Sequence, residues 1–290
     1  MLGSMVYAVL KDKYDLVITY RDADKLQLLY STYGQGANVE AVQVDWQELQ
    51  QDYLAGFQGK LFGSATEQVL NRLGNPDWVI NAVGVIKPHS LKDPVATLFI
   101  NGGLPHILAA KFGENLIHIA TDCVYDGTAE APYDENSIPR PVDLYGMSKL
   151  LGEPKKALVL RTSIVGPELG SSYGLLGWFQ SQTGKSANGF TNHLWNGITT
   201  REFGKICDQI ISGQVPHPGG GIYHIHSTDV TKYEMLVQFK KTFDLDIQIE
   251  PVVAPVAIDR RLATTLLFNT ALQVPAFVDM IADLVPQSVK

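Results

Sequence analysis

Short apolar runs alternate with stretches of helical periodicity through the first half of the chain. Runs rich in Val, Ile and Leu that end on polar or small residues are typical of buried parallel strands. The runs predict five strands, at residues 15–20, 42–45, 77–82, 115–120 and 157–161. Between them, apolar positions recur every three or four residues, which indicates helices. The clearest stripe is Leu98, Asn101, Leu104, Leu108 and Ala109.

This alternation of strand and helix predicts an α/β fold of the Rossmann-like, doubly wound type, with a parallel sheet covered on both faces. We expect this NAD(P)-binding domain over residues 1–165. From about Gly166 the sequence becomes rich in Gly, Ser and aromatic residues, and the alternation is lost. Residues 166–290 are therefore predicted to form a smaller substrate-binding portion, interleaved with the first domain.

The start of the chain departs from this pattern. A dinucleotide-binding fold opens with a strand and a Gly-rich turn, followed by a helix whose N-terminus faces the pyrophosphate. Here residues 1–4 run directly into an apolar run, 5–10, that is typical of the helix, and Gly3 stands where the last glycine of the turn is expected. We therefore expect the first strand and the first two glycines to be missing from the numbered sequence.

Composition and charge narrow the class of protein. The 290 residues are 45% hydrophobic and 18% charged, as in ordinary globular proteins. A net charge of −7 without a basic cluster argues against a nucleic-acid partner. The longest apolar runs are less than half of the roughly 20 residues that span a membrane, and no basic leader opens the chain. With only two cysteines, the sequence favours a reducing cytoplasm, with no membrane contact.

The strongest chemical signal combines one threonine with a tyrosine and a lysine. Thr121 ends the fourth predicted strand, and Tyr145 and Lys149 lie four residues apart on a predicted helix, so they share one face. A nearby ammonium would lower the pKa of a phenol. Tyr145 could then protonate a carbonyl oxygen that accepts hydride, and the Thr121 hydroxyl would hold the same oxygen. No metal is needed for this chemistry.

The run from His118 to Glu153 resembles the dTDP-4-dehydrorhamnose reductases of the extended short-chain dehydrogenase/reductase family. The matching elements are Thr121-Asp122-Cys123-Val124-Tyr125-Asp126-Gly127, Pro132-Tyr133 and Tyr145-Gly146-Met147-Ser148-Lys149. The resemblance implies a catalytic set of Thr121, Tyr145 and Lys149. It implies substrate contacts at Thr121 and Asp122, a supporting position for Asn101, and a position against the sugar for Ile164. The aromatic and amide residues of 189–197 add Trp195 as a candidate substrate contact. With the strand ends, it implies cofactor contacts at Gly3, Arg21, Asp45, Trp46, Ala82, Gly84, Val85, Ile86, Tyr145 and Lys149.

Arg21, just beyond the second strand of such a fold, suits the 2′-phosphate of NADPH. Asp22 follows directly, so NADH stays open as an alternative. Ile164 stands where rhamnose-forming enzymes usually carry a Trp, and Cys123 replaces an aromatic residue beside Thr121. These two departures leave the identity of the sugar open.

The expected function is NADPH-dependent reduction of the C4 ketone of a nucleotide diphosphate 4-keto-6-deoxysugar, for cell-surface polysaccharide synthesis. A first alternative is a non-catalytic binder that resembles the regulatory subunit of methionine adenosyltransferase. A second is an epimerase or dehydratase of nucleotide sugars, which ranks lower because Cys123 interrupts the expected acidic pair. The sequence allows a homodimer but does not establish one.

A histidine pair and a segment rich in aromatic residues are two further candidate features. His224 and His226 alternate on a predicted strand at 221–226, but no third ligand has a spacing that suits a metal. Residues 189–197 are predicted to form a loop before a helix that begins near Thr200, capped by Thr199 or Thr200. That loop would either order over a sugar or base, or pack as a connector with Trp195 in the core.

Overall fold

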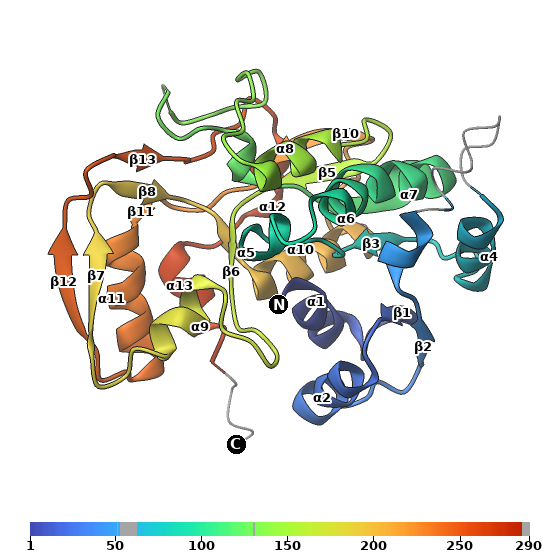
Figure 1. Cartoon of the computed structure of the whole chain (residues 1–290), viewed down its shortest axis with the longest axis horizontal. Coiled ribbons are helices and arrows are strands. Elements are labelled where there is room, and N and C mark those ends of the chain that lie inside the picture. Colours follow the sequence, from blue (N-terminus) through green and yellow to red (C-terminus); the bar gives the residue numbers. More distant parts are fainter. Residues whose placement is uncertain (51, 53–62, 130, 286–290) are drawn as a thin grey trace.

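The structure is a computed structural model that describes residues 1–50, 52, 63–129 and 131–285. It shows a mixed α/β architecture with parallel strands and flanking helices (Figure 1). The strands of its larger portion are β1 (Leu16–Tyr20), β2 (Val39–Gln43), β3 (Val79–Asn81), β4 (Leu116–Ile119), β5 (Leu158–Arg161) and β10 (Gly221–His224). The helices around them are α1 (Leu2–Leu10), α2 (Ala23–Tyr33), η1 (Trp46–Leu49), α4 (Ser64–Arg72), α5 (Lys87–Ser90), α6 (Pro94–Leu98), η2 (Phe99–Gly103), α7 (Leu104–Phe112), η3 (Gly113–Asn115), η4 (Asp122–Val124), α8 (Leu144–Leu151), α10 (Thr200–Ile211) and α12 (Phe268–Leu272).

The main sheet has the strand order β10-β5-β4-β3, and all its pairs are parallel. Side chains along a strand alternate between the two faces of a sheet. In β5, Leu158 and Leu160 pack into one hydrophobic cluster and Val159 into another, so both faces are covered. Every residue of β4 and β5 is buried. This is the doubly wound arrangement that the sequence predicts.

Strands β1 and β2 form a separate parallel pair. No backbone hydrogen bond joins this pair to β3 within the described part of the chain. The parallel strands of the larger portion thus form two sheets, because strands bond only to neighbours at about 4.8 Å and β1 and β3 are not neighbours. The five predicted strands are confirmed, although β2 begins at Val39, three residues before its predicted start.

The predicted apolar stripe lies on a nearly continuous helix made of α6, η2 and α7. Leu104, Leu108 and Ala109 are buried as expected, whereas Leu98 is 41% exposed, so its place in the core stripe was wrong. The π-helical turn at Phe99–Gly103 shifts the helical register and explains this difference. By length and composition Pro94–Asn115 could span a membrane, a longer apolar segment than the sequence reading found, but its most apolar window is 61% buried inside the protein, as in a core helix.

The smaller portion has its own hydrophobic core. It lies on the opposite side of the molecule from β1 and β2 (Figure 1). Its elements are β6 (Ile164–Val165), α9 (Leu175–Gln180), β7 (Ser186–Phe190), β8 (His193–Trp195), β9 (Ile198–Thr199), β11 (Val230–Thr231), α11 (Lys232–Phe243), β12 (Gln248–Val252), β13 (Ile258–Asp259) and α13 (Phe277–Ala282). Much of the predicted loop at 189–197 is strand in β7 and β8. The expectation of a loop was wrong because these strands pair with β12, β11 and β13, partners distant in sequence.

Two elements from the second half of the chain return to the larger portion. Strand β10 pairs with β5, and α10 packs against α1 so closely that a Cβ on Gly204 would lie 2.9 Å from Val9. The predicted start of α10 is confirmed, since the Thr199 side chain accepts a hydrogen bond from the backbone N–H of Glu202. Strand β10 thereby forms one edge of the sheet in which β4 leads to Thr121.

Candidate functional site

The carboxyl end of β4 presents the first two residues of the site. Thr121 and Asp122 follow the buried strand directly and are themselves almost fully buried. The Thr121 hydroxyl donates a hydrogen bond to the Asp122 carboxyl (3.2 Å) and accepts one from the backbone N–H of Cys123 (3.2 Å). Burial raises the pKa of Asp122, which disfavours its charged form. Ligands of open parallel sheets bind at this edge.

Helix α8 brings Tyr145 to the same place. The Asp143 carboxyl caps the helix by accepting a hydrogen bond from the N–H of Gly146 (2.8 Å). A Cβ on Gly146 would lie 2.3 Å from the carbonyl oxygen of Cys123, so only glycine allows the helix to approach the end of β4 this closely. The side chain of Tyr145 then lies close enough to the Thr121 hydroxyl for that hydroxyl to lower the pKa of the phenol, against the larger opposing effect of burial. The structure therefore brings together the threonine and tyrosine singled out by the sequence.

The third predicted member, Lys149, is buried one helical turn further along α8. Its ammonium donates a 2.6 Å hydrogen bond to the backbone carbonyl of Ile119, the last residue of β4. Burial lowers the pKa of Lys149 to about 8, while the nearby Glu153 carboxylate opposes this shift. The lysine is thus held against the strand that presents Thr121.

One electrostatic expectation differs from the structure. The sequence suggested that Lys149 lowers the pKa of Tyr145, but burial raises that pKa, and the charges of Cys123 and Asp122 act in the same direction. The physical reason is that the phenol loses hydration while the Lys149 ammonium is engaged by a carbonyl. Tyr145 is therefore a protonated phenol at neutral pH, ready to donate rather than to accept a proton.

A buried ion pair that sequence reasoning did not single out lies behind this set. Arg161, at the end of β5, binds Glu153 through two parallel hydrogen bonds of 2.8 and 2.6 Å. Arg161 also donates to the Tyr125 hydroxyl (2.9 Å), which lies near the His224 ring. No spacing rule joins Glu153 to Arg161, because only the packing of α8 on β5 brings them together. The His224 ring faces backbone carbonyls through its other nitrogen.

Asn101 links the helix layer to the segment expected to line the cofactor. Its amide accepts a hydrogen bond from the N–H of Val85 (2.8 Å) and donates to the Val85 carbonyl (2.9 Å) and to the Ser148 hydroxyl (3.0 Å). The side chain is 1% exposed. Direct substrate contact by Asn101 is therefore not supported, because both ends of its amide are already engaged. The residue instead fixes the loop after β3 against α8.

Other residues expected at the cofactor lie along the same edge. A Cβ on Gly3 would stand 3.5 Å from Ala82, so the start of α1 packs against the end of β3. Helix α1 begins at Leu2, which places Gly3 inside the first turn rather than before a helix at Met5. No side chain caps this helix, so its first backbone N–H groups are left without a side-chain acceptor, and such groups can bind an anion. Gly84 and Ile86 are exposed beyond β3.

The residues expected near the adenosine lie around β1 and β2. Arg21 follows β1 and is exposed, and its guanidinium has no hydrogen bond or ion pair among the described residues. Asp22 caps α2 by accepting from the N–H groups of Asp24 and Lys25, so its carboxylate is engaged away from Arg21. Asp45 caps η1 in the same way. Trp46 is 7% exposed and packs into the hydrophobic cluster that also holds Val42 and Val44.

Ile164 and Trp195, both expected at the substrate, differ in their surroundings. Ile164 lies on β6, half-buried, and packs on the core beside the end of β5. Trp195 is 4% exposed, with its ring edge-on to Phe277 at 5.5 Å between centroids. The structure therefore favours Trp195 as a packed connector over a sugar contact, which was one of the two interpretations of its sequence segment.

Taken together, these groups suit a carbonyl reduction. A protonated phenol and a neighbouring hydroxyl can both contact one oxygen atom. No set of three His, Cys, Asp or Glu side chains suited to a metal ion occurs in the described part of the chain. The uncapped start of α1 and the Arg21 guanidinium are the groups that would hold the phosphates of a dinucleotide.

Solved structures share this fold over nearly the whole chain. A protein from Sulfolobus tokodaii described as a hypothetical dTDP-4-dehydrorhamnose reductase superposes with a TM-score of 0.68, at 20% identity, covering 96% of this chain and 94% of that chain. The dTDP-4-dehydrorhamnose reductase of Bacillus anthracis, solved in complex with NADP, has a TM-score of 0.67 at 18% identity, covering 92% and 97%. At these identities the likeness establishes the fold.

Sequence relatives match over shorter segments. Methionine adenosyltransferase 2 subunit beta of Xenopus tropicalis is 32% identical over 151 residues, which are 47% of this chain and 44% of that protein. The dTDP-4-dehydrorhamnose reductase of Burkholderia thailandensis is 40% identical over 82 residues, 27% and 28% of the two chains. The aligned segments thus span less than half of these curated relatives. Over a much longer stretch, residues 42–270, the sequence matches the family described as the RmlD substrate binding domain, and the chain belongs to that family.

Proposed function

We propose that this protein reduces the C4 ketone of a nucleotide diphosphate 4-keto-6-deoxysugar with NADPH. The observation that carries the proposal is the close approach of α8 to the carboxyl end of β4, which places Tyr145 beside Thr121 and Lys149 on the Ile119 carbonyl. The NADP in the Bacillus anthracis structure and the reductase names of the relatives support the cofactor and the reaction class. Product supply to cell-surface polysaccharide synthesis and a cytoplasmic location are part of the same proposal.

The proposed reaction needs one hydride and one proton. Bound NADPH supplies the hydride to the carbonyl carbon. Thr121 and Tyr145 hold the carbonyl oxygen by hydrogen bonds, and the phenol of Tyr145 donates its proton as negative charge develops there. An alkoxide is more basic than a phenolate, so a raised pKa of Tyr145 keeps the acid loaded without preventing this transfer. The product is the sugar alcohol, and the phenolate regains a proton from solvent.

The proposal assigns residues to each part of the bound cofactor. The start of α1 at Leu2 and Gly3 would face the pyrophosphate, and Arg21 would pair with the 2′-phosphate. Val85 and Ile86 would line the nicotinamide half, fixed by Asn101. Asp45 and Trp46 would lie near the adenine, and Lys149 near the nicotinamide ribose. NADH remains the alternative donor.

The test is a Tyr145→Phe variant assayed with NADPH and dTDP-4-keto-6-deoxyglucose. Loss of the acidic proton should lower turnover by about 10²- to 10⁴-fold while the thermal unfolding midpoint stays unchanged. Tyr173→Phe is the matched control, because that tyrosine is 57% exposed and its ring lies edge-on against His89. Turnover within a few-fold of the original protein would remove Tyr145 from the mechanism.

The second candidate function is a non-catalytic regulatory subunit. The match to methionine adenosyltransferase 2 subunit beta favours it, since that alignment covers nearly twice the length of the reductase alignment. Its prediction is NADPH binding without turnover of any 4-keto sugar nucleotide, and co-elution with a methionine adenosyltransferase catalytic subunit. Size-exclusion chromatography of that mixture, beside the turnover assay, separates the two functions.

A further inference from the structure

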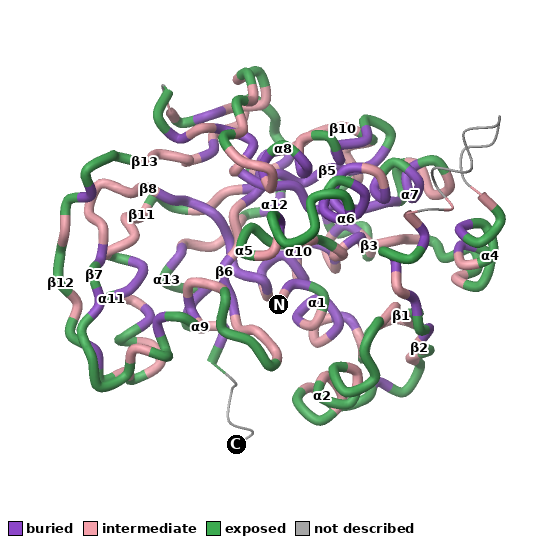
Figure 2. Tube along the Cα trace, viewed as in Figure 1, coloured by how far each residue is buried: buried purple, intermediate pink, exposed green. Residues whose placement is uncertain are grey.

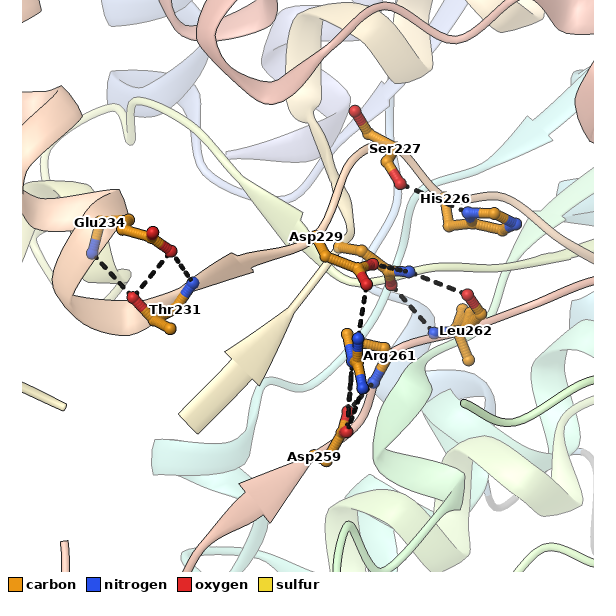
Figure 3. A network of polar contacts seen from close by, with 9 residues as sticks. His226, Ser227, Asp229, Thr231, Glu234, Asp259, Arg261 and Leu262 are labelled. Atoms are coloured by element: carbon orange, nitrogen blue, oxygen red, sulfur yellow. Dashed lines mark hydrogen bonds and ion pairs between the residues drawn. The ribbon is translucent and has the colours of Figure 1, made fainter. Parts of the chain in front are cut away.

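Two consecutive arginines near the end of the chain have opposite electrostatic surroundings. Arg261 pairs with the carboxylates of Asp229 and Asp259 (Figure 3). Arg260 donates to the backbone carbonyls of Tyr125 (3.0 Å) and Asp126 (3.1 Å) and forms no ion pair within the described part of the chain. Carbonyl oxygens orient a guanidinium without neutralising it, so Arg260 keeps its positive charge beside the loop that follows β4.

Lys232 is a second cation without a carboxylate partner. It opens α11, where Thr231 and Glu234 form a capping box that fixes the first turn (Figure 3). Its ammonium lies 5.4 Å from the centroid of the Trp195 ring, and it makes no hydrogen bond or ion pair with any residue the structure describes. Burial lowers the pKa of Lys232 to about 8. A half-buried ammonium that forms no ion pair is costly, so an anionic ligand would stabilise it.

Both cations act on the catalytic edge. The Asp122 carboxyl, next to Thr121, is the acidic group that the charges of Arg260 and Lys232 both stabilise. Burial works against the ionised form of this carboxyl, so one carboxyl does not balance two cations. The smaller portion thus contributes net positive charge to the end of β4, where the sequence and the fold place the substrate.

We propose that Lys232 and Arg260 bind an anionic oxygen of the substrate, either of its diphosphate or of a sugar carboxylate. The inference rests on the proposed function only in taking a sugar nucleotide as the substrate. In this arrangement Trp195 does not touch the sugar. Its ring instead lies against the Lys232 ammonium, and the ion pairs of Arg261 tie residue 261 to residues 229 and 259 next to Arg260.

The test compares Lys232→Met with two matched variants. Lys232→Arg keeps the charge, and Lys241→Met removes an exposed lysine from the same helix. Isothermal titration at fixed ionic strength measures the affinity of each variant for UDP, dTDP, UDP-glucose and UDP-glucuronic acid, and unfolding curves verify the fold. A charge-assisted hydrogen bond predicts a loss of about tenfold or more for Lys232→Met, with Lys241→Met unchanged and Lys232→Arg within a few-fold.

The pattern across the probes identifies the anionic group. A loss equal for UDP, dTDP and UDP-glucose supports a phosphate contact, and a loss confined to UDP-glucuronic acid supports a carboxylate contact. Affinities within threefold of the original protein for every probe overturn the inference, even if NADPH turnover is intact. A protein that binds none of the probes overturns this inference and the substrate class together. If binding depends on the Lys232 charge but no turnover is detected, the proposed reaction is contradicted and the anion-binding site is supported.

Discussion

The two parallel sheets of this protein show how unevenly its fold is stabilised. In the main sheet, β4 and β5 are buried at every position and are covered on both faces, whereas β1 and β2 are mostly half-buried or exposed. Figure 2 shows the same contrast, with buried chain along β5 and exposed chain over α2. The predicted proton donor lies on α8, beside the buried sheet, and the predicted 2′-phosphate contact follows the exposed strand β1. The proposed catalytic groups thus lie in a well-packed region, and the proposed selectivity residue lies in a lightly packed one.

The most direct test of this contrast removes one arginine at the end of a strand in each sheet. Arg161→Met should destabilise the protein by about 3–5 kcal/mol, because it leaves the buried Glu153 carboxylate without a partner. Arg21→Met should change the free energy of unfolding by less than about 0.5 kcal/mol, since Arg21 is exposed. Urea denaturation measures both. Equal effects would contradict the contrast between the sheets.

Truncation of apolar side chains tests the packing itself. Leu160→Ala, in the fully buried β5, should cost about 2–5 kcal/mol of stability through lost contacts and a cavity. Val17 on β1 is 44% exposed, so Val17→Ala should cost under about 1 kcal/mol. The same denaturation assay applies, and a larger cost at Val17 would place the core of the molecule elsewhere.

Cofactor selectivity should respond to the exposed pair alone. Arg21→Ala should raise the Kd for NADPH by about tenfold and leave the Kd for NADH unchanged, because only NADPH carries the 2′-phosphate. Fluorescence titration with both nucleotides measures this. Lys25→Ala, a nearby exposed cation on α2, is the control. An equal loss for both nucleotides would show that Arg21 does not read the 2′-phosphate.

The smallest expected effect is a pH dependence set by Lys149. Its pKa of about 8 means that the ammonium is present below this pH and is lost as pH rises through it. The pKa of Tyr145 is raised, so the phenol stays protonated over the same range. We expect kcat/KM for reduction to be flat near pH 7, halved near pH 8 and falling further above it. A flat profile to pH 10 would remove Lys149 from the rate-determining step.

Local sequence patterns predict much of the fold and identify the candidate site residues. Hydrophobic periodicity predicts the strands and the capped helix at Thr200, because burial preference and capping act within a few residues. The spacing of Tyr145 and Lys149 on one helix, with Thr121 after a strand, likewise follows from local geometry. None of these local patterns specifies which strands pair in the folded protein.

Tertiary structure alone decided what those residues experience. The Glu153–Arg161 pair, the exposure of Leu98 after a π-helical turn and the strands within 189–197 depend on contacts between segments far apart in sequence. The raised pKa of Tyr145 and the effect of the Lys232 and Arg260 charges on the pKa of Asp122 have the same origin. A sequence specifies which groups ionise, but hydration and charge at a site depend on what the folded chain packs around it.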